Sequence, residues 1–245
     1  MLRQARLEGA NLGETRMQGA NLSHTRMEGA ELGEARLEGA VLSGAQMDGA
    51  NLRKVRMEGA NLSEARMECA ALIGARLGGA ILGQARLEDA TLWDARMEGA
   101  DLTQARMQDA DLAYARMEGA NLGEARLEGA NLWDVGMEGA FLGQARMELA
   151  YLGEARMSDR TDLKGATFQG AALRSVDVSN VRISQAQVDA SFGDGGVVLP
   201  GTLTRPRHWP DWELPKHSED GGPTFDSELA KWRADPAAYT PPPPP

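Results

Sequence analysis

Few side chains in this sequence are of the types that perform catalysis or bind metals, and they are widely separated. His24, His208 and His217 are the only histidines, and they do not have the spacing of metal ligands. The single cysteine, Cys69, replaces a recurring glycine and has no histidine near it in the sequence that could activate its thiol. We therefore predict no metal site, no cofactor and no catalytic residue, and a protein that is not an enzyme.

The overall charge excludes the usual kind of nucleic-acid-binding protein. The 245 residues carry a formal net charge of −10, so the sequence lacks a basic footprint, and we expect no direct nucleic-acid binding. One cysteine permits no intrachain disulfide, which is typical of a reducing compartment, and no apolar run approaches the about 20 residues that span a bilayer. We predict a cytoplasmic protein with no membrane segment in this chain. The sequence opens inside its repeat, which leaves open an upstream segment before Met1.

The elements that could position functional groups are set by a five-residue repeat. Leucine or methionine recurs at every fifth residue from Leu2 to Met157, at thirty-two positions. Two residues before these positions stands a small residue, which is alanine with the exceptions of Thr15, Thr25, Val55 and Val135. A period of five matches neither the 3.6 residues of an α-helix nor the two residues of a flat strand. It matches a short extended segment followed by a corner.

The repeat predicts a common core. Within one extended segment, the leucine or methionine and the small residue two positions earlier point to the same side. If each repeat then turns a corner, both side chains face one axis. Corners favour glycine or aspartate, which tolerate unusual φ angles, and these recur at positions such as Gly9, Gly19, Asp89 and Asp109. We expect closed coils to stack at the β spacing of about 4.8 Å.

The pattern A-[N/D]-L-x-x, as in Ala20-Asn21-Leu22-Ser23-His24, resembles the pentapeptide-repeat family. The resemblance covers Met1 to Met157 in unbroken phase and residues 161 to 190 less regularly. It implies an all-β fold, a right-handed quadrilateral parallel β-helix with four repeats in each coil, and hence about eight coils. The period alone shows the five-residue unit but not the number four.

The repeat loses its phase once, after Met157. The next core position would be Asp162, but the apolar residue is Leu163. One extra residue within Ser158-Asp159-Arg160 therefore predicts a bulged corner, followed by about one and a half further coils whose core positions end at Val188. We expect the repeat domain to comprise residues 1 to 190.

Residues 191 to 245 are predicted to form an irregular, proline-rich C-terminal tail. A turn is expected at residues 193 to 196, a short strand at 197 to 199, extended chain at 205 to 212, and disordered chain or polyproline II at 241 to 245. One short helix is expected near 226 to 234, with Asp226 as its cap and Asp235-Pro236 as its end.

Two faces of the predicted rod carry paired charges. Arginines recur in steps of twenty, from Arg6 to Arg146 on one face and from Arg16 to Arg156 on the opposite face, and most are followed two residues later by an acid. Arg and Glu side chains that point outward side by side neutralise each other. The resemblance also offers an alternative function, because some family members mimic DNA, bind a type II topoisomerase (gyrase) and protect it from quinolones. Residues 1 to 157 hold 24 acidic and 17 basic residues, a net charge of −7 that does not form one acidic face.

The other two faces differ from each other. One carries a polar column that includes Asn21, Asn61, Asp101 and Asn121. The opposite face carries apolar and aromatic residues that a repeat core does not need, and we call it the aromatic face: Ile73, Trp93, Tyr114, Trp133 and Tyr151. A contiguous exposed apolar patch usually marks an interface. We therefore predict a structural or protein–protein interaction module whose protein partner the sequence does not identify.

Two further contacts are expected at the ends of the rod. No capping helix and no charged gatekeeper precede Leu2 at the start of the first coil, so we expect self-association through the N-terminal coil or a covering segment upstream. At the other end, Trp209, Trp212 and Trp232 lie in a tail too short to bury three indoles by itself. We expect the tail to fold back along the rod over the aromatic face, with a cap on the last coil only as the alternative.

Overall fold

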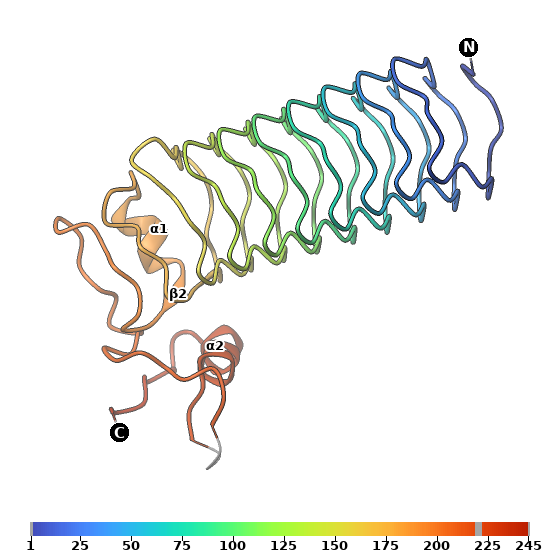
Figure 1. Cartoon of the computed structure of the whole chain (residues 1–245). Coiled ribbons are helices and arrows are strands. Elements are labelled where there is room, and N and C mark those ends of the chain that lie inside the picture. The colour runs from blue at the N-terminus through green and yellow to red at the C-terminus, as the bar shows by residue number, and fades with distance from the viewer. Residues whose placement is uncertain (1, 219–221, 245) are drawn as a thin grey trace.

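The computed structural model describes residues 2–218 and 222–244 and shows a long rod that ends in a compact C-terminal segment (Figure 1). Parallel bridges join residues twenty positions apart along the rod, from Arg6↔Arg26 to Gly136↔Arg156. Backbone hydrogen bonds connect each coil to the next; the N–H of Leu22, for example, donates to the carbonyl of Val41 at 2.8 Å. Four five-residue repeats therefore complete one coil of a parallel β-helix.

The predicted inward positions form the core. Every leucine or methionine of the repeat from Leu22 to Leu152 has an exposed fraction of 0%. Thr25, which replaces an alanine, is equally buried, and its hydroxyl donates to the carbonyl of Leu22 at 2.7 Å. The core thus accepts a polar side chain where the backbone supplies its hydrogen-bond partner.

All repeats turn their corners in the same way. The N–H of the small residue donates to the carbonyl of the leucine or methionine three residues earlier, as from Ala10 to Leu7 at 3.0 Å. The residue immediately before the small residue has a positive φ. This angle is 63° at Gly9, and it is also positive at larger residues, 55° at Glu14 and 62° at Leu149. The predicted preference for glycine or aspartate therefore holds only for alternate corners. Hydrogen bonds to the next coil hold larger residues in this conformation.

The phase slip lies where the sequence predicted it. The bridge Phe141↔Asp162 joins residues twenty-one positions apart, so one extra residue is accommodated before Asp162. Thr161 stabilises the bulge, because its hydroxyl donates to the carbonyl of Met137 at 2.9 Å and accepts from the N–H of Ser158 at 3.0 Å.

After the slip, the chain leaves the repeat earlier than predicted. Strand β1 (Ala172–Leu173) pairs in parallel with β2 (Phe192–Gly193), and between them lies α1 (Gln185–Asp189). The side of the coil that contains Val188 is a helix and not a five-residue repeat, because Ser184 and Gln187 form a capping box, although the pairing of Ala172 with Phe192 keeps the register of twenty. Val188 is still fully buried, so the helix closes the core in place of a coil.

The tail contains the expected helix, α2 (Phe225–Ala234), with a different cap. Thr224 is the N-cap and accepts from the N–H of Ser227, whereas Asp226 lies in the first turn, where its charge favours the helix N-terminus. The expected strand at 197 to 199 is reduced to one bridge, between Val198 and Asp177.

The tail packs against the last coils and does not run back along the rod (Figure 1). Trp209, 3% exposed, belongs to the core cluster of the rod, and Trp232 packs with Phe192 and Phe225 in a second cluster. Towards the N-terminus the tail covers Tyr151, whose ring centroid lies 6.2 Å from that of Phe225. The predicted fold-back over the aromatic face is therefore realised only at its C-terminal end: the tail reaches Tyr151 and Trp133, caps the end of the rod and leaves Trp93 and Tyr114 exposed. Within the described ranges, no helix is both long and apolar enough to cross a membrane.

Candidate interaction face

Four of the five predicted residues of the aromatic face form two pairs in the C-terminal half of the rod. The ring centroids of Trp93 and Tyr114 lie 5.5 Å apart with an interplanar angle of 67°. Those of Trp133 and Tyr151 lie 5.8 Å apart with an angle of 20°. Trp93 and Tyr114 are 44% and 42% exposed, whereas Trp133 and Tyr151 are half-buried. The register of twenty residues per coil brings these side chains together.

Small residues in the next coil allow the tryptophans to lie against the rod. Gly153 follows Trp133 by twenty positions, and a Cβ at Gly153 would collide with the ring of Trp133. Ala113 follows Trp93 by twenty positions and is only 5% exposed. The column thus alternates between a large ring and a small residue, and the small residue leaves space for the ring.

A groove of about 530 Å³ lies between the two aromatic pairs. Its floor contains Asp111, Ala113 and Asn131, and the amide Nδ2 of Asn131 donates to Oδ1 of Asp111 at 2.9 Å. Two residues of the tail, Lys216 and Asp226, complete its rim. Ile73, the fifth predicted residue, lies one coil before Trp93, is half-buried and does not line the groove.

Cations occupy one end of the groove. The Nζ atom of Lys216 lies 5.0 Å from the ring centroid of Trp133, and Cζ of Arg174 lies 5.7 Å from it. Both distances are typical of cation–π contacts. Burial raises the pKa of Tyr151 to about 12, and the nearby Asp226 carboxylate adds to this effect. Among the described residues, no cation lies over the ring of Trp93.

The predicted aromatic face omitted five residues that line the groove: Asp111, Ala113, Asn131, Lys216 and Asp226. Asp111 and Asn131 could have been found, because they stand two residues before Ala113 and Trp133 and share their coils. Lys216 and Asp226 belong to the non-repetitive tail. Without a repeat, the position of a residue in space cannot be predicted from its position in the sequence.

The face that the sequence analysis described as polar also exposes apolar side chains. Ile81 and Phe141 are 44% and 46% exposed and belong to the same column as Asn121, as the bridge Asn121↔Phe141 shows. The ring of Phe141 lies close to Gly143, where a Cβ would stand 2.5 Å from its Cζ. The column predicted as polar is therefore interrupted by exposed apolar residues. Phe141 itself does not line the groove described above.

The arginine and glutamate ladders are paired as predicted. Nε of Arg26, for example, lies 3.1 Å from Oε1 of Glu8 in the preceding coil and 3.5 Å from Oε1 of Glu28 in its own coil. Pairs across coils and within coils therefore alternate along both columns.

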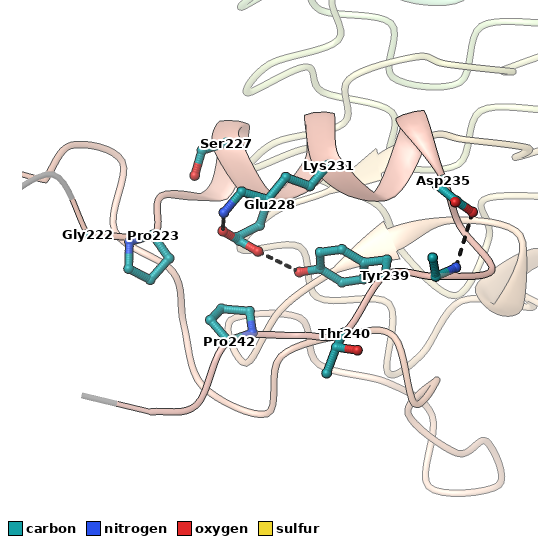
Figure 2. A pocket seen from close by; sticks show the side chains of 10 residues that line it. Gly222, Pro223, Ser227, Glu228, Lys231, Asp235, Tyr239, Thr240 and Pro242 are labelled. Carbon is teal, nitrogen blue, oxygen red and sulfur yellow. Dashed lines mark hydrogen bonds and ion pairs between the residues drawn. The ribbon is translucent and has the colours of Figure 1, made fainter.

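A second cavity, of about 650 Å³, lies beside α2 (Figure 2). Glu228 is 2% exposed and accepts from Nζ of Lys231 at 2.6 Å and from the hydroxyl of Tyr239 at 3.0 Å. Burial and the hydrogen bond with Glu228 raise the pKa of Tyr239 above its usual range. This network holds the C-terminal segment against α2, and the buried carboxylate is fully engaged by it.

The residues with catalytic side-chain types stay apart. His24 and Cys69 both lie at corners with positive φ, and His208 stacks on Trp232 with a centroid distance of 5.0 Å. In residues 2–218 and 222–244, no group of three or more His, Cys, Asp or Glu side chains could hold a metal ion.

Comparisons with known proteins agree on one kind of repeat. A family model described as pentapeptide repeats (8 copies) matches residues 2–39, 30–68, 65–104 and 105–144. A search of curated proteins finds no match to this sequence. The solved structures that are similar to the chain include the following two. QnrB1, a plasmid-mediated fluoroquinolone resistance protein, is 20% identical over 80% of this chain and 92% of that chain, with a TM-score of 0.58. HetL, a pentapeptide repeat protein involved in heterocyst differentiation regulation from the cyanobacterium Nostoc sp. strain PCC 7120, is 26% identical over 85% of this chain and 86% of that chain, with a TM-score of 0.47.

Proposed function

We propose that this chain, which belongs to the pentapeptide-repeat family, is a non-enzymatic rod that binds a protein partner through its aromatic face. Family membership gives it a right-handed β-helix, and the likeness to QnrB1 agrees with that fold. A rigid repeat of this kind presents side chains in straight columns, and extended surfaces of repeat proteins serve as binding surfaces.

The observation that carries the proposal is the exposure of Trp93 and Tyr114. They are 44% and 42% exposed and lie side by side at the edge of a groove. Tryptophan and tyrosine are enriched in interfaces, where each buries a large apolar surface. The ladders offer less to a partner, because their charges are already paired on the rod.

The carboxylates support a non-enzymatic role. Those of the ladders lie on the convex outside of the rod and pair with arginines, as Glu38 does with Arg36 at 3.3 Å and Arg56 at 2.9 Å. These arginines, together with backbone hydrogen bonds, lower the pKa of Glu38 against the opposing effect of burial. A general acid needs the opposite, a raised pKa in a cleft. The pKa of the ladder carboxyl Asp48 is raised to about 6, but Asp48 lies on the same convex surface and pairs with Arg66.

Capture experiments with matched variants test the interaction face. We expect the wild-type chain and Phe141→Leu to retain the same protein from native lysate, and the double variant Trp93→Leu/Tyr114→Leu to lose it. Phe141 is the appropriate control because it is equally exposed but lies on another face. Retention of the partner by the double variant would show that the aromatic face is not the binding surface.

The alternative function is that of a DNA mimic that binds a type II topoisomerase (gyrase). The similar fold of QnrB1, a fluoroquinolone resistance protein, favours it, whereas alternating Arg and Glu columns do not form the continuous acidic face of a duplex. Gyrase supercoiling assays with and without a quinolone separate the two functions. An interaction module of the proposed kind leaves both reactions unchanged.

We also propose a cytoplasmic location, on the basis of the single cysteine. A further proposal is that the chain associates with itself through the N-terminal coil. Leu2 is 42% exposed, and Leu7, Leu12 and Met17 are half-buried, whereas the corresponding positions from Leu22 to Leu152 are fully buried. An open core end of this kind favours contact with another copy of the chain.

A further inference from the structure

We infer that the groove between the two aromatic pairs takes the side chain of an arginine from an extended segment of the partner protein. This inference rests on the proposed function, since it names the chemistry by which the aromatic face recognises its partner. It concerns the half of the groove formed by Trp93, Tyr114 and Asp111.

The chain itself shows which chemistry the groove accepts. Lys216 comes from the tail, 83 positions after Trp133, and its ammonium lies 5.0 Å from the centre of that indole. Arg174 lies against the same ring at 5.7 Å. Two cations from different segments therefore converge on one tryptophan of the groove. The π face of an indole attracts cations more strongly than the rings of tyrosine or phenylalanine do.

The other half of the groove has the same aromatic wall without the cation. Trp93 and Tyr114 meet at 67°, so their rings form two sides of a corner that can enclose a flat group. No cation of the described residues lies over either ring. The existing pair of Lys216 and Arg174 would repel a further cation at the Trp133 end. An incoming positive group is thereby directed to the corner of Trp93 and Tyr114.

Carboxylates beside this corner supply the matching charge. Asp111 lies on the groove floor, where its Oδ1 accepts from the N–H of Ala113 at 3.2 Å and from Asn131 at 2.9 Å. Its second oxygen, Oδ2, has no hydrogen-bond partner in the described parts of the chain. Asp94, next to Trp93, is exposed and likewise makes no ion pair there. The ladder glutamates, in contrast, are neutralised by arginines.

Arginine fits these groups better than lysine. Its guanidinium is planar, stacks on aromatic rings and donates to carboxylates through several N–H groups, whereas the lysine ammonium is a compact, strongly hydrated charge. A guanidinium stacked on Trp93 could at the same time donate to the carboxylate of Asp111. Phe141 on the other face lacks such a site, since its ring lies over Gly143 and lines none of the cavities described above.

The test uses the full chain and two synthetic peptides that differ in charge only. One is acetyl-Gly-Ser-Gly-Arg-Gly-Ser-Gly-amide, and the other has citrulline, the neutral isostere, in place of arginine. Binding is followed by NMR from the indole N–H signals of the tryptophans and, for Trp93→Leu, from the arginine signals of the peptide. The salt concentration is about 0.15 M, which screens non-specific attraction to the acidic chain. We expect the arginine peptide to shift the Trp93 signal in a saturable way and the citrulline peptide to bind at least about tenfold more weakly.

Three variants complete the test. Trp93→Leu and Asp111→Asn should each weaken binding of the arginine peptide about five- to tenfold, and Phe141→Leu should leave it unchanged. Asp111→Asn keeps the Oδ1 acceptor for the Ala113 N–H, so its fold is preserved. Equal binding of both peptides, or full binding by Asp111→Asn, would overturn the arginine assignment.

The same proteins also separate this inference from the proposed function. If the peptides fail to bind but the double variant Trp93→Leu/Tyr114→Leu loses the captured partner, the aromatic face stands and only the arginine is wrong. If Trp93→Leu leaves peptide binding unchanged and the double variant retains the partner, both proposals are wrong.

Discussion

The coil that contains Gln46 should make the stability of this protein fall as the pH rises from about 4 to about 6. Glutamine replaces an arginine of the ladder at this position, so Asp48 has only Arg66 as its partner, with Oδ2 3.0 Å from Nη2. Burial and the adjacent Glu68 carboxylate raise the pKa of Asp48 from its ordinary value of 3.8 to about 6. The pKa of Glu68 is lowered instead, so Asp48 is the carboxyl of this pair that takes up a proton first as the pH falls.

The sign and size of the effect follow from the pKa of Asp48. A carboxyl whose pKa is higher in the folded state stabilises the fold at low pH, and this contribution is lost as the pH rises through the folded-state pKa. The difference between 3.8 and about 6 corresponds to at most about 3 kcal/mol. Solvent screening and the opposite change at Glu68 reduce the expected loss to about 1–2 kcal/mol.

Two substitutions test this reasoning by thermal unfolding between pH 4 and pH 8. Asp48→Asn removes the charge, so it should match the wild type at pH 4 and unfold about 2–8 °C higher at pH 7.5. Gln46→Arg restores the ladder and should also stabilise the chain at pH 7.5, by up to about 1 kcal/mol. As a control, Glu88→Gln removes a carboxylate 2.6 Å from Arg106 and should not stabilise. The reasoning fails if Asp48→Asn changes stability equally at all pH values.

Three further predictions concern packing. Met97→Asp should lower the free energy of unfolding by several kcal/mol, because Met97 is fully buried. Glu98→Gln on the outside should change this free energy by less than about 0.5 kcal/mol. Equal shifts of the two variants in circular-dichroism melts would contradict the assignment of Met97 to the inside of the rod. Gly153→Ala should displace the Trp133 ring and redden tryptophan emission, while Gly33→Ala in the same column, with its nearest atoms 3.9 Å away, should not. Self-association through the first coil should appear as a concentration-dependent mass in sedimentation equilibrium, and a monomer at all concentrations would exclude it.

The sequence alone determined the rod, because each repeat contacts its neighbours at a constant distance along the chain. A core residue every fifth position and a small residue two positions earlier predict the buried columns, and the extra residue before Asp162 predicts the slip to a register of twenty-one. Resemblance to a known family was needed for four repeats in each coil. With that number, the register also predicts which outward residues share a face, including Trp93 and Tyr114.

The tertiary structure decided the features that have no period. The capping box at Ser184 ended the coils where hydrophobic spacing alone predicted another one. The tail has no repeat, so its path depends on packing between distant residues, such as Trp209 in the rod core and Phe225 against Tyr151. For the same reason only the folded chain shows Lys216 at Trp133. In a periodic sequence, the spacing between residues predicts which of them are in contact. A non-periodic segment packs at the place where the free energy gained by burying its aromatic rings exceeds the entropic cost of closing the loop.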